Sequence, residues 1–507
     1  MSFEIGTASN FEDLFIKLET FLTSRGHAFG KRFSGIGTGN FTTYQGKVGT
    51  VAQTITCTAT SATSFDVVGS VSGALGTATV GTPFTSAQID FTITAGGTAY
   101  VAGDVWTITV SPAWTLSRQF NGVWRNNVTI GLTSFTHGGA AGQNSIRAIR
   151  PFECREITIT PASAEQTPSA FQIDWSDDGT NWTNAQSYSG VTTGWNLSVA
   201  RRFAVAAAGT HRWWRIRTTA YNTTNVNVTT DYFDTVASGA GWQTQFPWMA
   251  VKSPGNDGLL QTVFHSLQAQ DIPGSDIYSM VVYPHTSYSA LNSADTQPGR
   301  DGGFAIVPAA NIAMNYWMVA NGRRFAMGLK VSTIYAGMYM GLMLPYARPS
   351  VYPLPWFLGG SSSNAATRWS DSGTSVLNVF ARAQDSASVS GQAAVRDITG
   401  VWRHVAQHNI LSSDATFAPG RMYPQSLRGS GSGINYVREN FGGGYPLIPL
   451  APGVTSVGMM GEIDGCFWTT GFGQAAENTI NVDRFDHVVF QNIFRNTIAD
   501  YWALRMD

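Results

Sequence analysis

The chain has 507 residues, of which 12% are charged and 12% aromatic, and its formal net charge is -1. That length exceeds what one hydrophobic core supports, so we expect three or four domains. With 31 Lys and Arg against 32 Asp and Glu, no surplus of positive charge is available for phosphates or anionic lipid, which argues against nucleic acid and membranes as partners.

The abundance of Gly, Thr, Ser and aromatic residues favours pleated sheets and turns over helices. We therefore expect a mainly β protein with several β-sandwich or jelly-roll domains and a short N-terminal helix. The predicted domains are an N-terminal helix and connecting arm (1–46), an inserted small β-sandwich (47–111), a jelly roll (112–252) and a β-rich C-terminal domain (253–507).

The first predicted element is a helix near the N-terminus. Apolar residues recur there at three- and four-residue spacing from Phe11 to Leu22, Ser9 and Glu12 have the spacing of a capping box, and Gly26 follows the last apolar turn. The segment before it lacks the basic start and apolar core of a signal peptide. The three cysteines are far apart, so we expect reduced, buried thiols in a cytoplasmic protein: Cys57, Cys154 and Cys466.

Next comes the block of residues 47–111, which is poor in charge. Short alternating runs at 88–94 and 105–110 are separated by Gly-rich turns, which is typical of a small antiparallel sandwich. The Gly-rich run 35–39 that precedes the block has no Walker lysine, so we interpret it as a loop or a packing surface and not as a phosphate cradle.

In region 112–252, apolar and polar residues alternate strongly along the predicted strands. The run 171–175 is followed by a turn at 176–181, and in the run 211–217 we expect Trp214 and Ile216 to face a core while Trp213 and the arginines face solvent or a partner.

Region 253–507 contains the longest apolar run, Ile334 to Pro345, which is too short for a membrane span and predicts a buried strand pair. Pro-rich segments at 345–355 and Gly/Ser stretches at 359–363 and 428–433 predict surface loops. The segment 486–504 predicts a strand followed by a short helix.

Two resemblances follow from these runs. The stretch 315–346, with Asn315-Tyr316-Trp317 and Leu344-Pro345-Tyr346, resembles virion structural proteins of tailed bacteriophages, and residues 89–108 resemble small β modules of phage tail and baseplate proteins. The helix at Phe11 also looks like the N-terminal start of such proteins. This resemblance implies a structural subunit that assembles with copies of itself and other virion proteins.

The second resemblance covers about residues 123–234. The run 171–182 followed by 212–217 is similar to discoidin-like jelly rolls. Such domains often bind sugars, so the resemblance implies a glycan as a partner but supplies no ligand residues.

Catalytic and metal signals are weak, and we predict no catalytic, cofactor-binding or metal-ligating residue. His404 and His408 have helix-face spacing but no third ligand, and Asp174, Asp177 and Asp178 resemble a calcium loop without its spacing, so turns and solvated side chains explain them better. Glycoside hydrolysis needs a pair of carboxylates, and the candidate pairs are explained equally well as parts of turns. These candidates are Asp231 with Asp234 and Glu462 with Asp464.

The aromatic surplus is more informative. The chain has 16 tryptophans, and Trp, Tyr and Arg are enriched where proteins bind partners. As candidates for a glycan or partner contact we name Trp182, Trp195 and Trp213.

Three functions compete. The first is a structural component of a phage particle, in the tail or baseplate or at fibre attachment, assembled in the host cytoplasm and located in the virion. A head-decoration or collar protein is an alternative role within the particle, and a glycan-binding receptor-recognition protein is the second function. A polysaccharide hydrolase ranks last, so we expect no enzyme.

Overall fold

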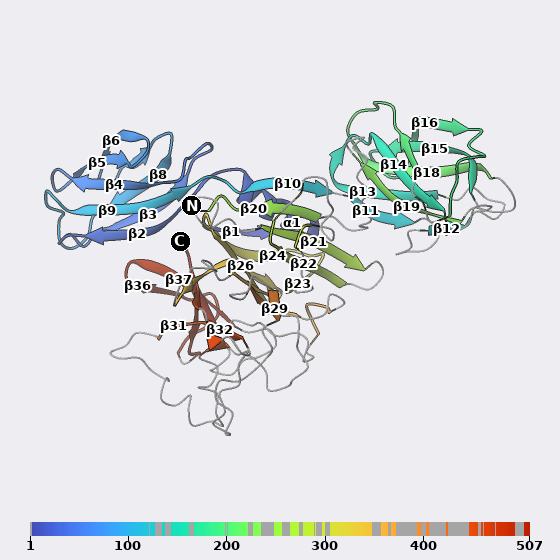
Figure 1. Cartoon of the computed structure of the whole chain (residues 1–507). Helices are drawn as coiled ribbons and strands as arrows, with labels where there is room; N and C mark the ends of the chain where they lie inside the picture. Colours follow the sequence, from blue (N-terminus) through green and yellow to red (C-terminus); the bar gives the residue numbers. More distant parts are fainter. Residues whose placement is uncertain are drawn as a thin grey trace, which may run out of the picture.

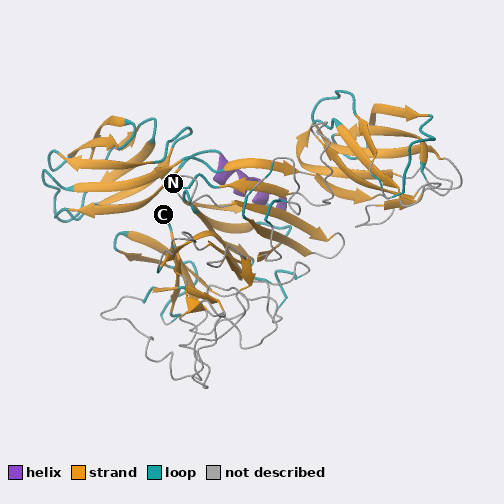
Figure 2. Cartoon of the chain, viewed as in Figure 1, coloured by secondary structure: helices purple, strands orange, loops and turns teal. Residues whose placement is uncertain are grey.

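A computed structural model of the chain describes residues 3–120 and most of 122–346. From 347 to 460 it describes short segments, and from 461 to 507 all residues except 472 and 492–500. These described residues form one helix and 38 strands, and every strand pairing is antiparallel (Figure 2). The expected mainly β fold with sandwich domains and a short N-terminal helix is confirmed.

The helix α1 spans Phe11–Thr23. Its N-cap is Asn10 and not the expected Ser9: the Asn10 side chain accepts from the Asp13 amide at 2.9 Å. Asp13 in turn accepts from the Ser9 amide at 2.7 Å. The cap is shifted by one residue because an amide side chain caps as well as a hydroxyl, and Asp13 reaches the amide of Ser9, the residue before the cap, in place of the cap amide that a capping box uses.

The central sheet is built mostly from the region after residue 300. Its strand order is β1 (Phe3–Ala8), β24 (Met314–Ala320), β25 (Arg324–Val331), β26 (Ile334–Pro345), β27 (Trp356–Gly359), β28 (Ala393–Arg396) and β29 (Trp402–His404), and β34 (Gly461–Ile463) also pairs with β26. The expected strand pair at 334–345 is therefore wrong, because this run is one long strand.

Both faces of the central sheet are covered, which explains that apolar run. One face packs with α1 and a five-stranded sheet in one core cluster, and the other face packs with a C-terminal sheet in a second cluster. A strand buried on both faces is apolar at every position and not only at alternate ones. The five-stranded sheet contains β10 (Thr115–Phe120), β20 (Trp248–Lys252), β21 (Phe264–Ile272), β22 (Ile277–His285) and β23 (Ala305–Ala309).

The C-terminal sheet has the order β31 (Ile448–Pro449), β35 (Cys466–Thr469), β38 (Tyr501–Arg505), β37 (Phe485–Gln491) and β36 (Thr479–Val482), and a small sheet contains β30 (Met422–Tyr423), β32 (Ala451–Val454) and β33 (Gly458–Met459). The short helix expected at the end of segment 486–504 is wrong over its last residues, because residues 501–505 form a strand. Of the predicted surface loops, 428–433 lies outside the described residues, as does most of 345–355. The surface loop predicted at 359–363 is wrong, because Gly359 ends β27 and Ser361 and Ser362 are fully buried with their amides bonded to the Ile306 carbonyl.

The N-terminal sandwich has two sheets around their own core. One contains β2 (His27–Ser34), β9 (Val105–Ser111), β4 (Gln53–Ala59), β5 (Ser64–Gly69) and β6 (Gly73–Thr79), and the other β3 (Asn40–Gly46), β8 (Ile89–Thr94) and β7 (Pro83–Thr85). Strands β2 and β3, which precede residue 47, thus pair with strands of the predicted insertion.

The jelly roll also has two sheets around one core. The five-stranded sheet contains β11 (Gly122–Asn126), β13 (Gln143–Phe152), β18 (His211–Tyr221), β15 (Pro168–Ser176) and β16 (Thr183–Ser189), and the four-stranded sheet contains β12 (Ser134–Thr136), β19 (Asn227–Asp234), β14 (Glu156–Pro161) and β17 (Arg201–Ala204). Neighbouring strands within each sheet are mostly not consecutive, as expected for a jelly roll.

The N-terminal sandwich and the jelly roll lie on opposite sides of the central unit (Figure 1). A side-chain contact reaches the central unit from the jelly roll, since Arg212 donates to Glu12 of α1 at 3.0 Å. Among the described residues, no helix combines the length and the hydropathy needed to span a bilayer. The expected buried thiols are confirmed, because all three cysteines are free and buried.

Candidate functional site

The candidate site is the outer face of the five-stranded jelly-roll sheet. Strand β18 alternates, so that Trp214 and Ile216 are fully buried in the core while Trp213, Arg215 and Arg217 are half-buried on the other face. The expected division of this strand is confirmed for these five residues, whereas Arg212 is in the phase of Trp214 and contacts Glu12 of α1. The pleat therefore presents an indole and two guanidinium groups in a row along one strand.

A buried carboxylate on the neighbouring strand holds the two arginines. Asp174 of β15 is the register partner of Arg215 and accepts from its Nε at 2.9 Å. The Nε of Arg217 lies 3.5 Å from the same Oδ2, and Asn184 of β16 donates to Oδ1 at 3.1 Å. A buried charge is tolerated when it is paired and hydrogen-bonded in this way, so Asp174 orders the face across three strands.

The turn between β15 and β16 places the Trp182 ring against the guanidinium of Arg215. The guanidinium carbon of Arg215 lies 4.2 Å from the centre of the Trp182 ring, which is a cation–π contact. Gly179, with φ +75°, lies against Trp213, and a Cβ at Gly179 would come within 2.9 Å of that indole. The turn can therefore lie this close to the indole only with glycine at that position.

The acidic residues of this turn serve the turn itself. Asp178 accepts from the amides of Thr180 and Asn181, both at 2.7 Å, and these bonds hold the pKa of its carboxyl below the usual range. The turn predicted from Asp178-Gly179 is confirmed.

Asp177 contacts a histidine instead. Its Oδ1 lies 3.0 Å from Nδ1 of His211, whose ring stacks on Trp175 with a centroid separation of 3.5 Å. The carboxylates considered for calcium thus all have protein partners. In the part of the chain that the structure describes, no group of three or more acidic, His or Cys residues is arranged to hold a metal.

Trp195 does not share the candidate site. It is 8% exposed in the jelly-roll core, and its Nε1 donates to the Val191 carbonyl at 2.7 Å. Arg201 covers its ring at 5.0 Å. The structure thus brings two of the three predicted tryptophans, Trp182 and Trp213, to one face and places the third inside.

The sequence analysis missed Asp174 and Asn184 as members of this face. Asp174 occupies an outward position directly after inward Ile173, on a strand whose neighbour carries Arg215 and Arg217 two residues apart. An acid in that phase, opposite arginines in the same phase, is the signal that predicts a cross-strand ion pair.

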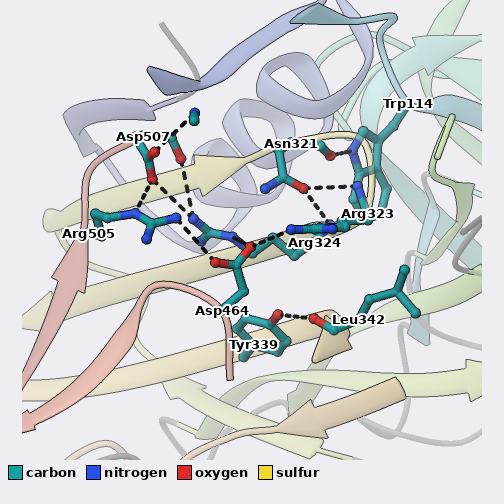
Figure 3. A network of polar contacts seen from close by, with 10 residues as sticks. Trp114, Asn321, Arg323, Arg324, Tyr339, Leu342, Asp464, Arg505 and Asp507 are labelled. Carbon is teal, nitrogen blue, oxygen red and sulfur yellow. Dashed lines mark hydrogen bonds and ion pairs between the residues drawn. The ribbon is translucent and has the colours of Figure 1, made fainter. Parts of the chain in front are cut away.

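The hydrolase candidate Asp464 belongs to a buried network that ties the C-terminal sheet to the central sheet (Figure 3). It accepts from Arg324 Nε at 3.0 Å and from Arg505 at 3.1 Å, and Arg323 lies 3.6 Å away. Burial raises the pKa of Asp464, but the three arginines lower it further, so the carboxyl stays ionised. It therefore has no proton to donate as a general acid.

The remaining candidates are dispersed. Glu462 is half-buried on β34, and Asp231 and Asp234 lie on β19, where their side chains are outside the described residues. His404 lies on strand β29, so helix-face spacing does not apply to it, and His408 is outside the described residues.

Backbone amides of the Gly-rich run 35–39 bind a carboxylate of the same chain. The amides of Ile36 and Gly37 each donate to the Asp104 carboxylate at 3.0 Å. Burial raises the pKa of Asp104, but its bonds from backbone amides lower it further. The run is a packed loop, as interpreted from the sequence.

No family model and no curated protein matches the chain. Among solved structures, the family 32 carbohydrate-binding module of EndoD from Streptococcus pneumoniae matches at 10% identity and a TM-score of 0.17, over 22% of this chain and 93% of that one. The C-terminal domain of a chitobiase from Bacteroides fragilis matches at 15% identity and 0.17, over 24% and 95%.

A truncated AlyQ with a CBM32 and an alginate lyase domain matches at 9% identity and a TM-score of 0.19, over 43% of this chain and 80% of that one. With scores this low, these likenesses carry no argument by themselves. The structures named here are carbohydrate-binding modules or proteins related to carbohydrate processing, and none is a virion protein.

Proposed function

We propose that the jelly roll binds a glycan on the outer face of its five-stranded sheet. The observation that carries the proposal is the placement of Trp182 and Trp213 on one partly exposed face, beside arginines fixed by a buried carboxylate. Sugar rings have apolar C–H faces that pack on indole rings and hydroxyls that pair with guanidinium and amide groups. Both kinds of contact are available within this face.

The proposed activity is binding without turnover. Asp174, the buried acid of this face, is held by Arg215 and Arg217, so its carboxylate serves to order the face and is not placed to act as the acid of a glycoside-hydrolysing pair. Incubation of the protein with its glycan should therefore release no reducing ends.

The test is a glycan array followed by calorimetry on the full chain. Replacing one stacking ring removes roughly 50–60 Å² of apolar contact, or about 1.4 kcal/mol, so Trp182→Ala should weaken binding about tenfold. Trp182→Phe should restore part of the affinity because it keeps an aromatic face.

The control is Arg202→Ala, which removes an exposed arginine from β17 on the opposite sheet. It should leave the affinity unchanged. Equal losses in Arg202→Ala and Trp182→Ala, or no loss in Trp182→Ala, would contradict the proposed site.

Assembly into a phage particle is our second candidate, and it rests on the sequence resemblance together with exposed apolar side chains at loops of the N-terminal sandwich, where Val48 is 80% and Val71 69% exposed. The two functions are compatible, because a virion protein can carry a receptor-binding domain. Incorporation of the chain into particles, seen in a particle reconstruction, would support this reading, and a strict monomer that is absent from particles would contradict it.

A further inference from the structure

The described side chains of the candidate face carry no surplus of positive charge. The guanidinium groups of Arg215 and Arg217 both lie against the buried carboxylate of Asp174, with their Nε atoms 2.9 and 3.5 Å from the same oxygen. The adjoining turn adds two exposed carboxylates, those of Asp177 and Asp178. An acidic ligand would gain no net attraction here, so the face is suited to a neutral one.

An amide on this face has a donor that the protein leaves unused. Gln172 of β15 is half-buried and is the register partner of Arg217. A guanidinium can only donate, so the Gln172 atom that accepts from Arg217 Nη2 is the oxygen Oε1. This contact fixes which way the amide is turned. Its Nε2 reaches the surface without a hydrogen-bond partner among the described residues, and is therefore a positioned donor for a ligand.

This donor lies at the other end of the face from Trp213. Trp213 of β18 pairs with Ser176 of β15, and Arg217 pairs with Gln172 four residues away along each strand. At about 3.3 Å of rise per residue, the two positions are roughly 13 Å apart. Trp182 lies between them, against Arg215. One pyranose ring is shorter than this distance, so a ligand that contacts both tryptophans and Gln172 has to be a chain.

Uncharged polar side chains of β16 adjoin the Gln172 end of this path. Ser187 is the register partner of Gln172, and Asn184 is the partner of Asp174. Both are exposed, and the Ser187 hydroxyl donates to the Asn184 side-chain oxygen at 3.1 Å. Because amides and hydroxyls both donate to and accept from sugar hydroxyls, this end of the face favours a further sugar residue over an apolar or a charged group.

We propose that the face binds a neutral oligosaccharide chain of at least three residues. The chain lies along β18, with sugar rings on Trp213 and Trp182 and a further residue that accepts a hydrogen bond from Nε2 of Gln172. Arg217 is a positioning residue that holds the Gln172 amide. This inference rests on the proposed function, because it names the class of ligand for the same site.

The experiment measures the affinity of the full chain by calorimetry for three neutral ladders of one to six residues: cello-, N-acetylchito- and galacto-oligosaccharides. An oligogalacturonate is the acidic probe. In a ladder that binds, affinity should rise about tenfold from the disaccharide to the tetrasaccharide, because a hydrogen-bonded residue is added, and should then level off. The oligogalacturonate should bind no more tightly than the neutral chains.

The variant Gln172→Met keeps the length of the side chain and removes the donor. It should lower affinity for the tetrasaccharide about tenfold and leave affinity for the disaccharide unchanged, which also shows that the variant is folded. The matched control is Gln186→Met on β16. Gln186 pairs with the core residue Ile173 and so lies in the phase of the opposite face. This control should change neither affinity.

A monosaccharide that binds as tightly as the tetrasaccharide, with binding weakened by Trp182→Ala, would overturn the chain and leave the glycan site standing. Equal tetrasaccharide affinity in Gln172→Met and wild type would overturn the role of Gln172, and tighter binding of the oligogalacturonate would overturn the neutral class. If none of the ladders binds, the inference falls. If in addition no glycan of a broad array binds, or binding is indifferent to Trp182→Ala, the proposed function falls with it.

Discussion

At the scale of single residues, burial controls the chemistry of the ionisable groups more than sequence context does. His27 is fully buried beside the ring of Phe21, with centroids 5.4 Å apart. Burial lowers the pKa of His27 to about 3, against a smaller opposite effect of the Leu22 carbonyl. The neutral imidazole is therefore part of the folded state.

This histidine predicts a loss of stability in acid. In the unfolded chain His27 takes up a proton below pH 6.5, whereas in the fold it stays neutral down to about pH 3. Its contribution is thus fully present above pH 6.5 and is lost as the pH falls below that value, by about 2 kcal/mol at pH 5. His27→Phe should reduce the drop in unfolding free energy between pH 7.5 and pH 5 by this amount.

Chemical unfolding curves of wild type and His27→Phe at the two pH values measure the difference. An identical pH dependence in the two proteins would contradict the assignment.

Single residues also show why part of the candidate site could not be predicted from the sequence. The division of β18 into core and surface residues follows from its period of two, and the turn follows from Asp178-Gly179. The partner of Asp174 does not, because Arg215 is 41 residues away and only the register of two strands brings them together. The burial of Trp195 likewise depends on loop geometry that no local pattern encodes.

At the scale of elements, ionic contacts connect the end of the chain with strands far away in sequence. Arg324 is fully buried, with Nε 3.0 Å from Asp464 and Nη2 3.4 Å from Asp507. Arg505 contacts both aspartates. The network joins β25, β38 and the turn before β35 (Figure 3).

Arg324→Met should destabilise the protein by about 3–5 kcal/mol, because it leaves buried carboxylates with less positive charge. The double variant Arg324→Met with Asp464→Leu should lose less than the single one, since both charges are then gone. Thermal and chemical unfolding measure the two losses. A double variant that is less stable than Arg324→Met would contradict this account of the network.

Element types followed from sequence where one face of an element was exposed. The helix and the alternating strands of the jelly roll are of this kind. The run 334–345 was misjudged because a strand covered on both faces has no period. Residues 501–505 were misjudged for the same reason, since Ala503 is as fully buried as Trp502 and Leu504 on the other face.

At the scale of the whole molecule, polar contacts attach the N-terminal sandwich to the C-terminal sheet. Arg484, in the turn between β36 and β37, donates to the Gly37 carbonyl at 3.0 Å and covers the Phe33 ring at 4.3 Å. Asp507 accepts from the Gly30 amide at 3.1 Å. These contacts span more than 400 residues of sequence, so no local pattern predicts them.

Arg484→Ala should loosen this attachment without unfolding either part, since each has its own core. Loss of the hydrogen bond and the ring contact should raise hydrogen exchange of the backbone amides in 33–39 about tenfold. Exchange in the jelly roll serves as the internal control. Unchanged exchange at 33–39 would show that the attachment does not depend on Arg484.

The central claim is that a glycan lies on the outer face of the β11–β13–β18–β15–β16 sheet. A crystal structure of the full chain with the oligosaccharide selected by array and calorimetry tests it most directly. The account predicts sugar density in contact with Trp182 or Trp213, with an oxygen of the sugar within hydrogen-bond distance of Arg217. Sugar density confined to another surface of the protein, with these three side chains uncovered, would contradict it.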